Sequence, residues 1–221
     1  MIVAIDGPAG SGKSSTARAV ARALGFRHLD SGAFYRALTL AALRRGIPVD
    51  RWDSLGREQL EQLGVTAEPA EPGFRVCIDG DDASEAIRAA EVNANVSAMA
   101  RVPAVRSWLL DQLRSAALGT DLVADGRDMG TVVFPNADLK VFLVAEPRVR
   151  ATRRLAQMGL PTDPAAVRAE VQRIEARDRT DSQRAASPLR QAPDAVLLDT
   201  SGMEFADQVA RVVALARERL R

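Results

Sequence analysis

Residues 1–15 read MIVAIDGPAGSGKSS, and this stretch decides the fold. The run 2–5 is apolar and too short for a helix of its own, so it predicts a buried parallel strand. Gly7, four further residues, and then Gly12, Lys13 and Ser14 match the phosphate-binding loop pattern GxxxxGK[ST] in full. The pattern predicts a phosphate site directly after the first strand.

A helix is expected to follow this loop. Apolar side chains recur at helical spacing at Ala17, Val20, Ala21 and Leu24, and Gly25 stands where a helix commonly ends in a left-handed conformation. Strand, loop and helix therefore come in the order that the motif requires.

The residue types in the loop suit a nucleoside triphosphate. Main-chain N–H groups can wrap phosphates only where side chains are small and positive φ is tolerated. We expect Lys13 to reach the β- and γ-phosphates and the Ser14 hydroxyl to ligate Mg²⁺, beside the partial positive charge of the helix N-terminus. The predicted ATP-binding residues are Gly7, Pro8, Ala9, Gly10, Ser11, Gly12, Lys13, Ser14 and Ser15.

Lysine is rare in the rest of the chain. Of the 30 basic residues only Lys13 and Lys140 are lysines, and all others are arginines. A phosphate-binding loop requires a compact ammonium rather than a planar guanidinium, which accounts for the exception at Lys13.

Composition limits the class of protein. With 221 residues, of which 47% are hydrophobic, the chain can bury one domain core and a smaller insertion. A formal net charge of +1 predicts no overall attraction to nucleic acid or to an anionic membrane.

The chain has a single cysteine, Cys77, and a single histidine, His28, which excludes an intrachain disulfide and a Cys/His zinc site. Without a long apolar run or room for a signal peptide before the first strand, we expect a soluble, cytoplasmic protein.

Short apolar strands alternate with amphipathic helices, which is typical of a parallel α/β sheet. We expect a three-layer α/β fold with a five-stranded parallel sheet made of residues 2–5, 27–29, 122–124, 139–144 and 195–198. The expected helices are residues 13–24, 32–45, 102–118, 147–158, 164–179 and 204–220.

Between about residues 48 and 96 this alternation of strands and helices changes. Residues 65–68 and 74–78 predict a small insertion with an antiparallel ribbon, around an AEPAEPG segment and a DGDD turn.

Three clusters place arginine beside small hydroxyls or carboxylates. The first follows the second strand, where Ser31 is expected to cap a helix that carries Arg36 one turn later. The second is DGRDMG at residues 125–130, at the carboxyl end of the third strand, where Asp125 is a candidate Mg²⁺ ligand. The third is RDRTD at residues 177–181, with Arg184 close behind.

These clusters bear on the acceptor of the phosphoryl group. Transfer to an acceptor that is itself a phosphate brings two anions together, and fixed cations must offset their repulsion. Several arginines suit that task. An acceptor hydroxyl would instead need a catalytic base, for which Asp30 or Asp128 is available, so the chemistry alone leaves both kinds of acceptor open.

The chain resembles the bacterial cytidylate kinases, a family of nucleoside monophosphate kinases, over essentially its whole length. The segments that carry the resemblance include LDSGAFYRALTLAAL, ADGRDMGTVVFPNADLKVFL and RDRTDSQRAASPL, beside the loop IDGPAGSGKSS. The resemblance implies transfer of the ATP γ-phosphoryl group to CMP or dCMP with Mg²⁺, in pyrimidine nucleotide metabolism. It also implies a monomer with one kinase domain over residues 1–221, in which the insertion at about 48–96 binds CMP and a lid lies at about 150–185.

The resemblance assigns roles to single residues. For the CMP phosphate these are Ser31, Arg36, Arg127 and Arg184; for the ribose, Arg177 and Asp181; and for the cytosine, Ser97, Arg106 and Asp128. The expected catalytic cations are Lys13, Arg127, Arg184, Arg150 and Arg154. A carboxylate at Asp128 suits cytosine, which offers it an amino donor, whereas uracil would turn an oxygen toward it. Arg106 could instead be a surface residue of an amphipathic helix.

Two other functions share the loop. A kinase for AMP, UMP or a hydroxylated metabolite differs only in its acceptor. A nucleotide-switched regulatory module would need no second anionic ligand, and the arginines Arg36, Arg127 and Arg184 argue against it.

Overall fold

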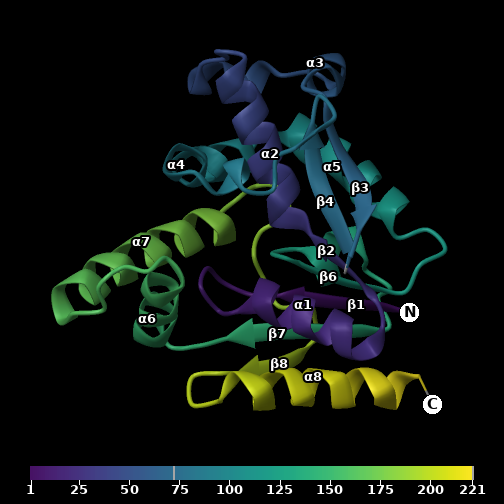
Figure 1. The fold of residues 1–221 in the computed structure, drawn as a ribbon, viewed down its shortest axis with the longest axis vertical. Helices are drawn as coiled ribbons and strands as arrows, with labels where there is room; N and C mark the ends of the chain where they lie inside the picture. Colours follow the sequence, from purple (N-terminus) through teal and green to yellow (C-terminus); the bar gives the residue numbers. More distant parts are fainter. Residues whose placement is uncertain (72, 221) are drawn as a thin grey trace. The chain divides into compact units, whose positions relative to one another are not determined.

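The computed structural model describes residues 1–71 and 73–220 (Figure 1), so Pro72 of the AEPAEPG segment lies outside the described residues. The chain divides into two compact units. The first contains Met1–Phe26 and Asp121–Arg221, and the second contains Arg27–Thr120. The first unit thus carries the phosphate-binding loop together with the second and third arginine clusters.

The first unit is built on four parallel strands in the order β6-β1-β7-β8. Their bounds are Leu122–Gly126 for β6, Ile2–Asp6 for β1, Leu139–Val144 for β7 and Val196–Asp199 for β8. Strand β1 lies between β6 and β7, and its residues Val3 and Ile5 are fully buried. The parallel register brings the carboxyl ends of β1 and β6 to the same edge of the sheet, where the loop begins.

Two helices pack against each other over this sheet. They are α1 (Lys13–Leu24) and α8 (Phe205–Arg219), and Figure 1 shows α8 in yellow running alongside β7 and β8. Val20 of α1 and Val212 of α8 belong to one core cluster with the buried side chains of β1 and β7. Helix α1 ends at Gly25 with φ 71°, as the sequence predicts.

A second helix pair, α6 (Pro147–Gln157) and α7 (Pro164–Ser182), completes the first unit and is drawn in green in Figure 1. Each helix begins with proline in its first turn, where the missing N–H costs nothing. The Asp163 side chain caps α7 by accepting hydrogen bonds from the N–H groups of Ala165 and Ala166.

The strands of the second unit pair in the order β3-β4-β2, with β5 paired to β4. Its strands are β2 (Arg27–Asp30), β3 (Val65–Ala70), β4 (Gly73–Ile78) and β5 (Asp81–Asp82). Strands β3 and β4 are antiparallel, so the predicted ribbon is confirmed. Strand β4 also pairs in parallel with β2, and the ribbon is therefore an extension of a sheet rather than a separate element.

Gly73 allows β4 to pair with β2. At the pairing of His28 with Gly73, a Cβ atom on Gly73 would overlap the backbone of His28.

The sequence prediction of five strands was too low, because it counted the ribbon apart from the parallel strands and missed the two-residue strand β5.

The helices of the second unit are α2 (Ser31–Arg44), α3 (Arg57–Gln62), α4 (Ala90–Met99) and α5 (Pro103–Ala116), with 3-10 turns at Val49–Ser54 and Ala86–Arg88. The prediction found α2 and α5 and missed α3 and α4.

The N-cap of α2 was predicted wrongly. It is Asp30 and not Ser31, since the Asp30 carboxylate accepts the Ala33 N–H at 3.1 Å. Among the described helices, none is long and apolar enough to cross a membrane.

Candidate active site

The phosphate-binding loop has the backbone that its glycines predict. Gly7, Gly10 and Gly12 have φ values of 153°, 73° and 87°. Gly7 is further constrained, because a Cβ atom there would overlap the carbonyl oxygen of Leu143 at the end of β7. The Ser11 hydroxyl is buried in the loop and has no hydrogen-bond partner among the described residues. The loop is therefore a compact cradle with a polar group directed into it.

Lys13 is buried at the first position of α1, and its Nζ donates a hydrogen bond to the Pro8 carbonyl at 2.7 Å. Burial lowers the pKa of the Lys13 ammonium well below its usual value, and the guanidinium groups of Arg127 and Arg177 lower this pKa further. The carboxylates of Asp125 and Asp178 act in the opposite direction. Cations from two different predicted clusters thus lie close enough to Lys13 to change its proton affinity.

The two predicted magnesium ligands are adjacent. The Ser14 hydroxyl donates a hydrogen bond to Asp125 Oδ2 at 2.5 Å, and Asp125 is buried at the end of β6. Hydroxyl and carboxylate oxygens are the hard ligands that Mg²⁺ prefers, and Mg²⁺ at nucleotide sites takes its other ligands from water and phosphates. The described residues contain no cluster of three or more His, Cys, Asp or Glu side chains that could hold a metal.

Asp6 fixes the turn that carries the second arginine cluster. Its Oδ1 and Oδ2 accept the N–H groups of Met129 and Gly130 at 2.8 and 2.7 Å, at the start of a π-helical turn over Met129–Val133. Burial raises the pKa of the Asp6 carboxyl to about 6, against the two hydrogen bonds that lower it. Asp128, whose charge also raises the pKa of Asp6, is buried at the N-cap of this turn.

Arg127, Asp181 and Arg184 come together. Arg127 Nε donates to Asp181 Oδ2 at 2.9 Å, and Arg184 Nη1 lies 4.0 Å from Asp181 Oδ1. Arg184 also donates through Nε to the Asp181 carbonyl and through Nη2 to the Ser187 carbonyl. Two predicted phosphate ligands therefore flank one carboxylate.

The two predicted lid arginines make different contacts. Arg150 is buried and donates to the carbonyls of Ala145 and Ala9 and to the carboxylate of Asp178. Arg154 pairs with the buried Glu170 of α7 at 2.8 Å. Arg150 thus contacts the loop backbone itself, whereas Arg154 links α6 to α7.

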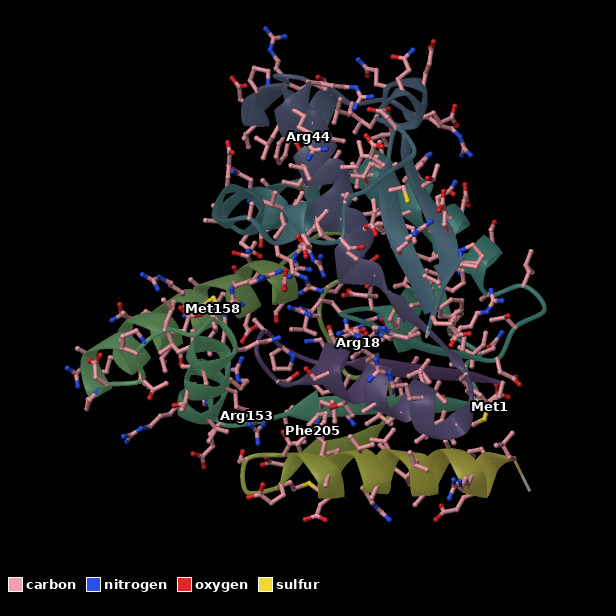
Figure 2. The ribbon with its side chains drawn as sticks, in the orientation of Figure 1. Met1, Arg18, Arg44, Arg153, Met158 and Phe205 are labelled. Carbon is pink, nitrogen blue, oxygen red and sulfur yellow. The ribbon has the colours of Figure 1, made fainter. Side chains whose placement is uncertain are left out.

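A cavity of about 740 Å³ opens beside the loop, within the range of small-molecule sites. It is lined by Gly10, Gly12 and Ser15 of the loop, by Arg153 and Arg154 of α6, by residues 201–204, and by Phe205 at the start of α8. Two of the lining residues, Arg153 and Phe205, are labelled in Figure 2. Arg153 is held there by hydrogen bonds to Thr200, at 3.1 Å to the hydroxyl and 2.7 Å to the carbonyl.

The second unit holds the other predicted substrate residues. Ser31 and Arg36 lie on α2, and Arg36 Nε lies 3.5 Å from the side-chain oxygen of Asn93 on α4, to which it donates. Ser97 follows Asn93 on α4 by one helical turn, so both residues lie on the same side of that helix. The three predicted residues are thus carried by two helices that pack against each other.

Arg106 on α5 is buried, so the alternative of a surface residue is wrong. Its guanidinium carbon lies 5.6 Å from the centre of the Tyr35 ring, and its Nη1 donates to the Ala100 carbonyl at 3.1 Å. The ring contact and the hydrogen bond together restrict the rotamers of this guanidinium.

Sequence reasoning missed several residues that support this site. They are Asp6 and Asp178, which accept backbone N–H groups, and Asn93 and Tyr35, which orient arginines. Gln208 of α8 is also buried and donates to the Thr16 hydroxyl of α1. In the sequence, the one indication that Asp6 and Asp178 belong to the site is their position: Asp6 directly precedes the phosphate-binding loop, and Asp178 lies within the RDRTD cluster.

The chain is similar to known proteins over almost its whole length. The cytidylate kinase family model matches residues 3–218. A cytidylate kinase of Mycobacterium avium is 47% identical over 224 residues, which cover 99% of this chain and 96% of that protein. One of Neisseria meningitidis is 42% identical over 217 residues, with 98% and 97% covered. An uncharacterized protein from Eubacterium ventriosum, solved as a crystal structure, shares the fold with a TM-score of 0.51, at 10% identity over 97% of both chains. The family match extends over nearly the whole chain, and the chain belongs to the cytidylate kinase family.

Proposed function

We propose that this protein transfers the γ-phosphoryl group of ATP to CMP or dCMP, giving ADP and CDP or dCDP. The observation that carries the proposal is the pair of arginines, Arg127 and Arg184, on either side of Asp181 in the unit that also holds the phosphate-binding loop. Cations brought this close together repel one another unless anions lie among them, and a triphosphate facing a nucleoside monophosphate supplies such anions.

In this reaction the bond between the γ-phosphorus and the bridging oxygen of ATP breaks, and a bond to a phosphate oxygen of CMP forms. Lys13, Arg127 and Arg184 would stabilise the charge on the transferring group and on the two flanking phosphates. No covalent intermediate on the protein is needed. Mg²⁺, held by Ser14 and Asp125, would supply further neutralisation of the ATP phosphates.

We infer that the nucleoside of ATP binds in the cavity beside the loop. The cavity begins at Gly10 and Gly12, next to where the phosphates would lie, and extends between Arg153 of α6 and the segment before α8. Its mixture of guanidinium groups and the half-exposed Phe205 ring suits a flat base, which stacks on either.

For CMP, the proposed ligands are those that the family resemblance implies. Ser31, Arg36, Arg127 and Arg184 would bind its phosphate, Arg177 and Asp181 its ribose, and Ser97, Arg106 and Asp128 its base. We also propose that residues 48–96 form a CMP-binding insertion and that residues 150–185 form a lid. The same proposal includes a monomeric state, a cytoplasmic location and a place in pyrimidine metabolism.

The experiment that tests the reaction follows the label of γ-³²P-ATP in the presence of CMP. We expect the label to appear in CDP, with release of free phosphate at a far lower rate. Label that appears only in free phosphate would contradict phosphoryl transfer to CMP and would favour a nucleotide-switched module. Label on the protein would contradict direct transfer.

A further inference from the structure

Both polar groups of Ala9, at the tip of the phosphate-binding loop, are bound by side chains of the α6–α7 pair. The Ala9 N–H donates to Asp178 Oδ1 of α7 at 2.7 Å. Arg150 Nη1 of α6 donates to the Ala9 carbonyl at 2.8 Å and to Asp178 Oδ2 at 2.5 Å. Three hydrogen bonds thus close a ring between the loop and two helices.

This ring is shielded from water. The side chains of Arg150 and Asp178 are 7% and 17% exposed. Arg150 is fixed at a further point, because its Nε donates to the Ala145 carbonyl at 2.9 Å, just before α6 begins. Hydrogen bonds between charged groups are strong in such a setting, and the loss of one partner leaves the other charge buried and unpaired.

Apolar contacts hold the same point. Ala9 is 1% exposed and belongs to a core cluster with Ala151 and Leu155 of α6 and with Val167 and Ile174 of α7. The neighbouring Gly10 approaches the backbone so closely that an added Cβ would lie 3.1 Å from the Arg150 carbonyl oxygen. The tip of the loop is therefore packed onto the helix pair as well as hydrogen-bonded to it.

From these contacts we propose that Asp178 is a positioning residue for ATP: it holds the Ala9 peptide groups and so fixes the loop in the conformation that receives the triphosphate. The inference rests on the proposed function only in taking ATP as the ligand of the loop. Asp178 itself touches no reacting atom, and its neighbours on α7, Arg177 and Asp181, belong to the proposed acceptor site. Helix α7 thus carries proposed groups for both substrates. Separate measurements with ATP and with CMP show which of the two substrates a substitution at Asp178 affects.

The test compares Asp178→Ala and Asp178→Asn with Glu175→Gln, which removes one negative charge from the same helix about one turn earlier. Equilibrium binding of ATP is measured by calorimetry without an acceptor, and KM is measured for ATP and for CMP. For Asp178→Ala we expect the Kd and the KM for ATP to rise about tenfold or more, since a charge-assisted hydrogen bond to the loop is lost. The KM for CMP should change less than about threefold, and Glu175→Gln should leave both constants near the wild-type values.

Asp178→Asn keeps the size of the side chain and one oxygen, but it turns an amide N–H₂ toward Arg150 or toward the Ala9 N–H. We expect an intermediate rise in the Kd for ATP, and this variant decides the question if Asp178→Ala fails to fold. A lower melting temperature with unchanged ATP binding would overturn the proposal, because Asp178 would then support only the packing of α7. Equal rises in the two KM values would also overturn it. ATP binding in the absence of acceptor does not depend on CMP phosphorylation, so failure of the proposed reaction would leave this test intact.

Discussion

Lys13 is a buried cation whose pKa is lowered by burial and by two neighbouring guanidinium groups. A buried and partly repelled ammonium contributes little to the stability of the fold, but it is well placed for phosphate charge. We predict that Lys13→Met lowers turnover by about 100- to 1000-fold, as removal of one charge-stabilising donor commonly does. The melting temperature should stay the same or rise, because the variant removes a desolvated charge and keeps the apolar stem.

ADP formation and thermal unfolding measure these two effects. The matched control is Lys140→Met, the other lysine of the chain, which pairs with Asp194 rather than with the loop. Near-normal turnover in Lys13→Met would exclude its assigned role.

Asp128 is the proposed reader of the cytosine amino group. Its carbonyl accepts the N–H groups of Val132 and Val133, so the backbone of the residue is fixed while the carboxylate is buried at the turn. We predict that Asp128→Ala lowers kcat/KM for CMP by at least about tenfold, because the amino group of the bound base loses its acceptor. The effect on UMP should be smaller, and the ratio of the two constants should fall. An unchanged ratio would mean that another residue reads the base.

At the scale of residues, the sequence predicts side chains that act within a local motif, such as Ser14 and Lys13. It does not reveal side chains that accept a backbone N–H group from a distant segment. Asp6 is separated by 123 positions from Met129, and Asp178 by 169 positions from Ala9. Both are ordinary carboxylates in the sequence, and only the fold brings each of them to its partner.

The π-helical turn Met129–Val133 depends on Asp6 at the end of strand β1. Asp6 accepts two N–H groups of that turn, and its pKa is raised from 3.8 to about 6, chiefly by burial. The folded protein therefore binds a proton at Asp6 more tightly than the unfolded chain does. Through this group, the free energy of unfolding falls as pH rises from about 4 to about 6 and is then constant.

Asp6→Asn removes this titration. We predict that the stability of the wild type relative to the variant falls by about 1.4 kcal/mol per pH unit across this window. Urea unfolding at pH 4.5, 5.5 and 7.0 measures the difference. A difference that does not change with pH would show that the pKa of Asp6 is not raised. Activity of the variant should fall at every pH, because an amide cannot accept both N–H groups.

At the scale of elements, hydrophobic periodicity was sufficient for the long helices and for the parallel strands. All five predicted strands are present, as β1, β2, β6, β7 and β8. The helix α4 escaped prediction because its sequence, AEVNANVSAM, has little contrast between an apolar and a polar face. The pairing of β4 with β2 could not be predicted either, since register between strands depends on which of them meet in the fold.

For the molecule as a whole, the phosphate-binding loop and the alternation of strands and helices predicted the α/β fold, and the resemblance of segments such as ADGRDMGTVVFPNADLKVFL predicted the cytidylate kinase family. The sequence could not show which unit would hold each part of the proposed site. The structure assigns the donor loop and the groups Arg127, Asp128, Arg177, Asp181 and Arg184 to the first unit, and it assigns Ser31, Arg36, Ser97 and Arg106 to the second.

The acceptor is identified by the rate of ADP formation from MgATP when CMP, dCMP, UMP, AMP, GMP and shikimate are offered separately. Chromatography identifies each product. We predict turnover mainly with CMP and dCMP, and one CDP or dCDP formed for each ADP. Equal or faster turnover with AMP, GMP or shikimate, or none with CMP, would contradict the assignment of the acceptor.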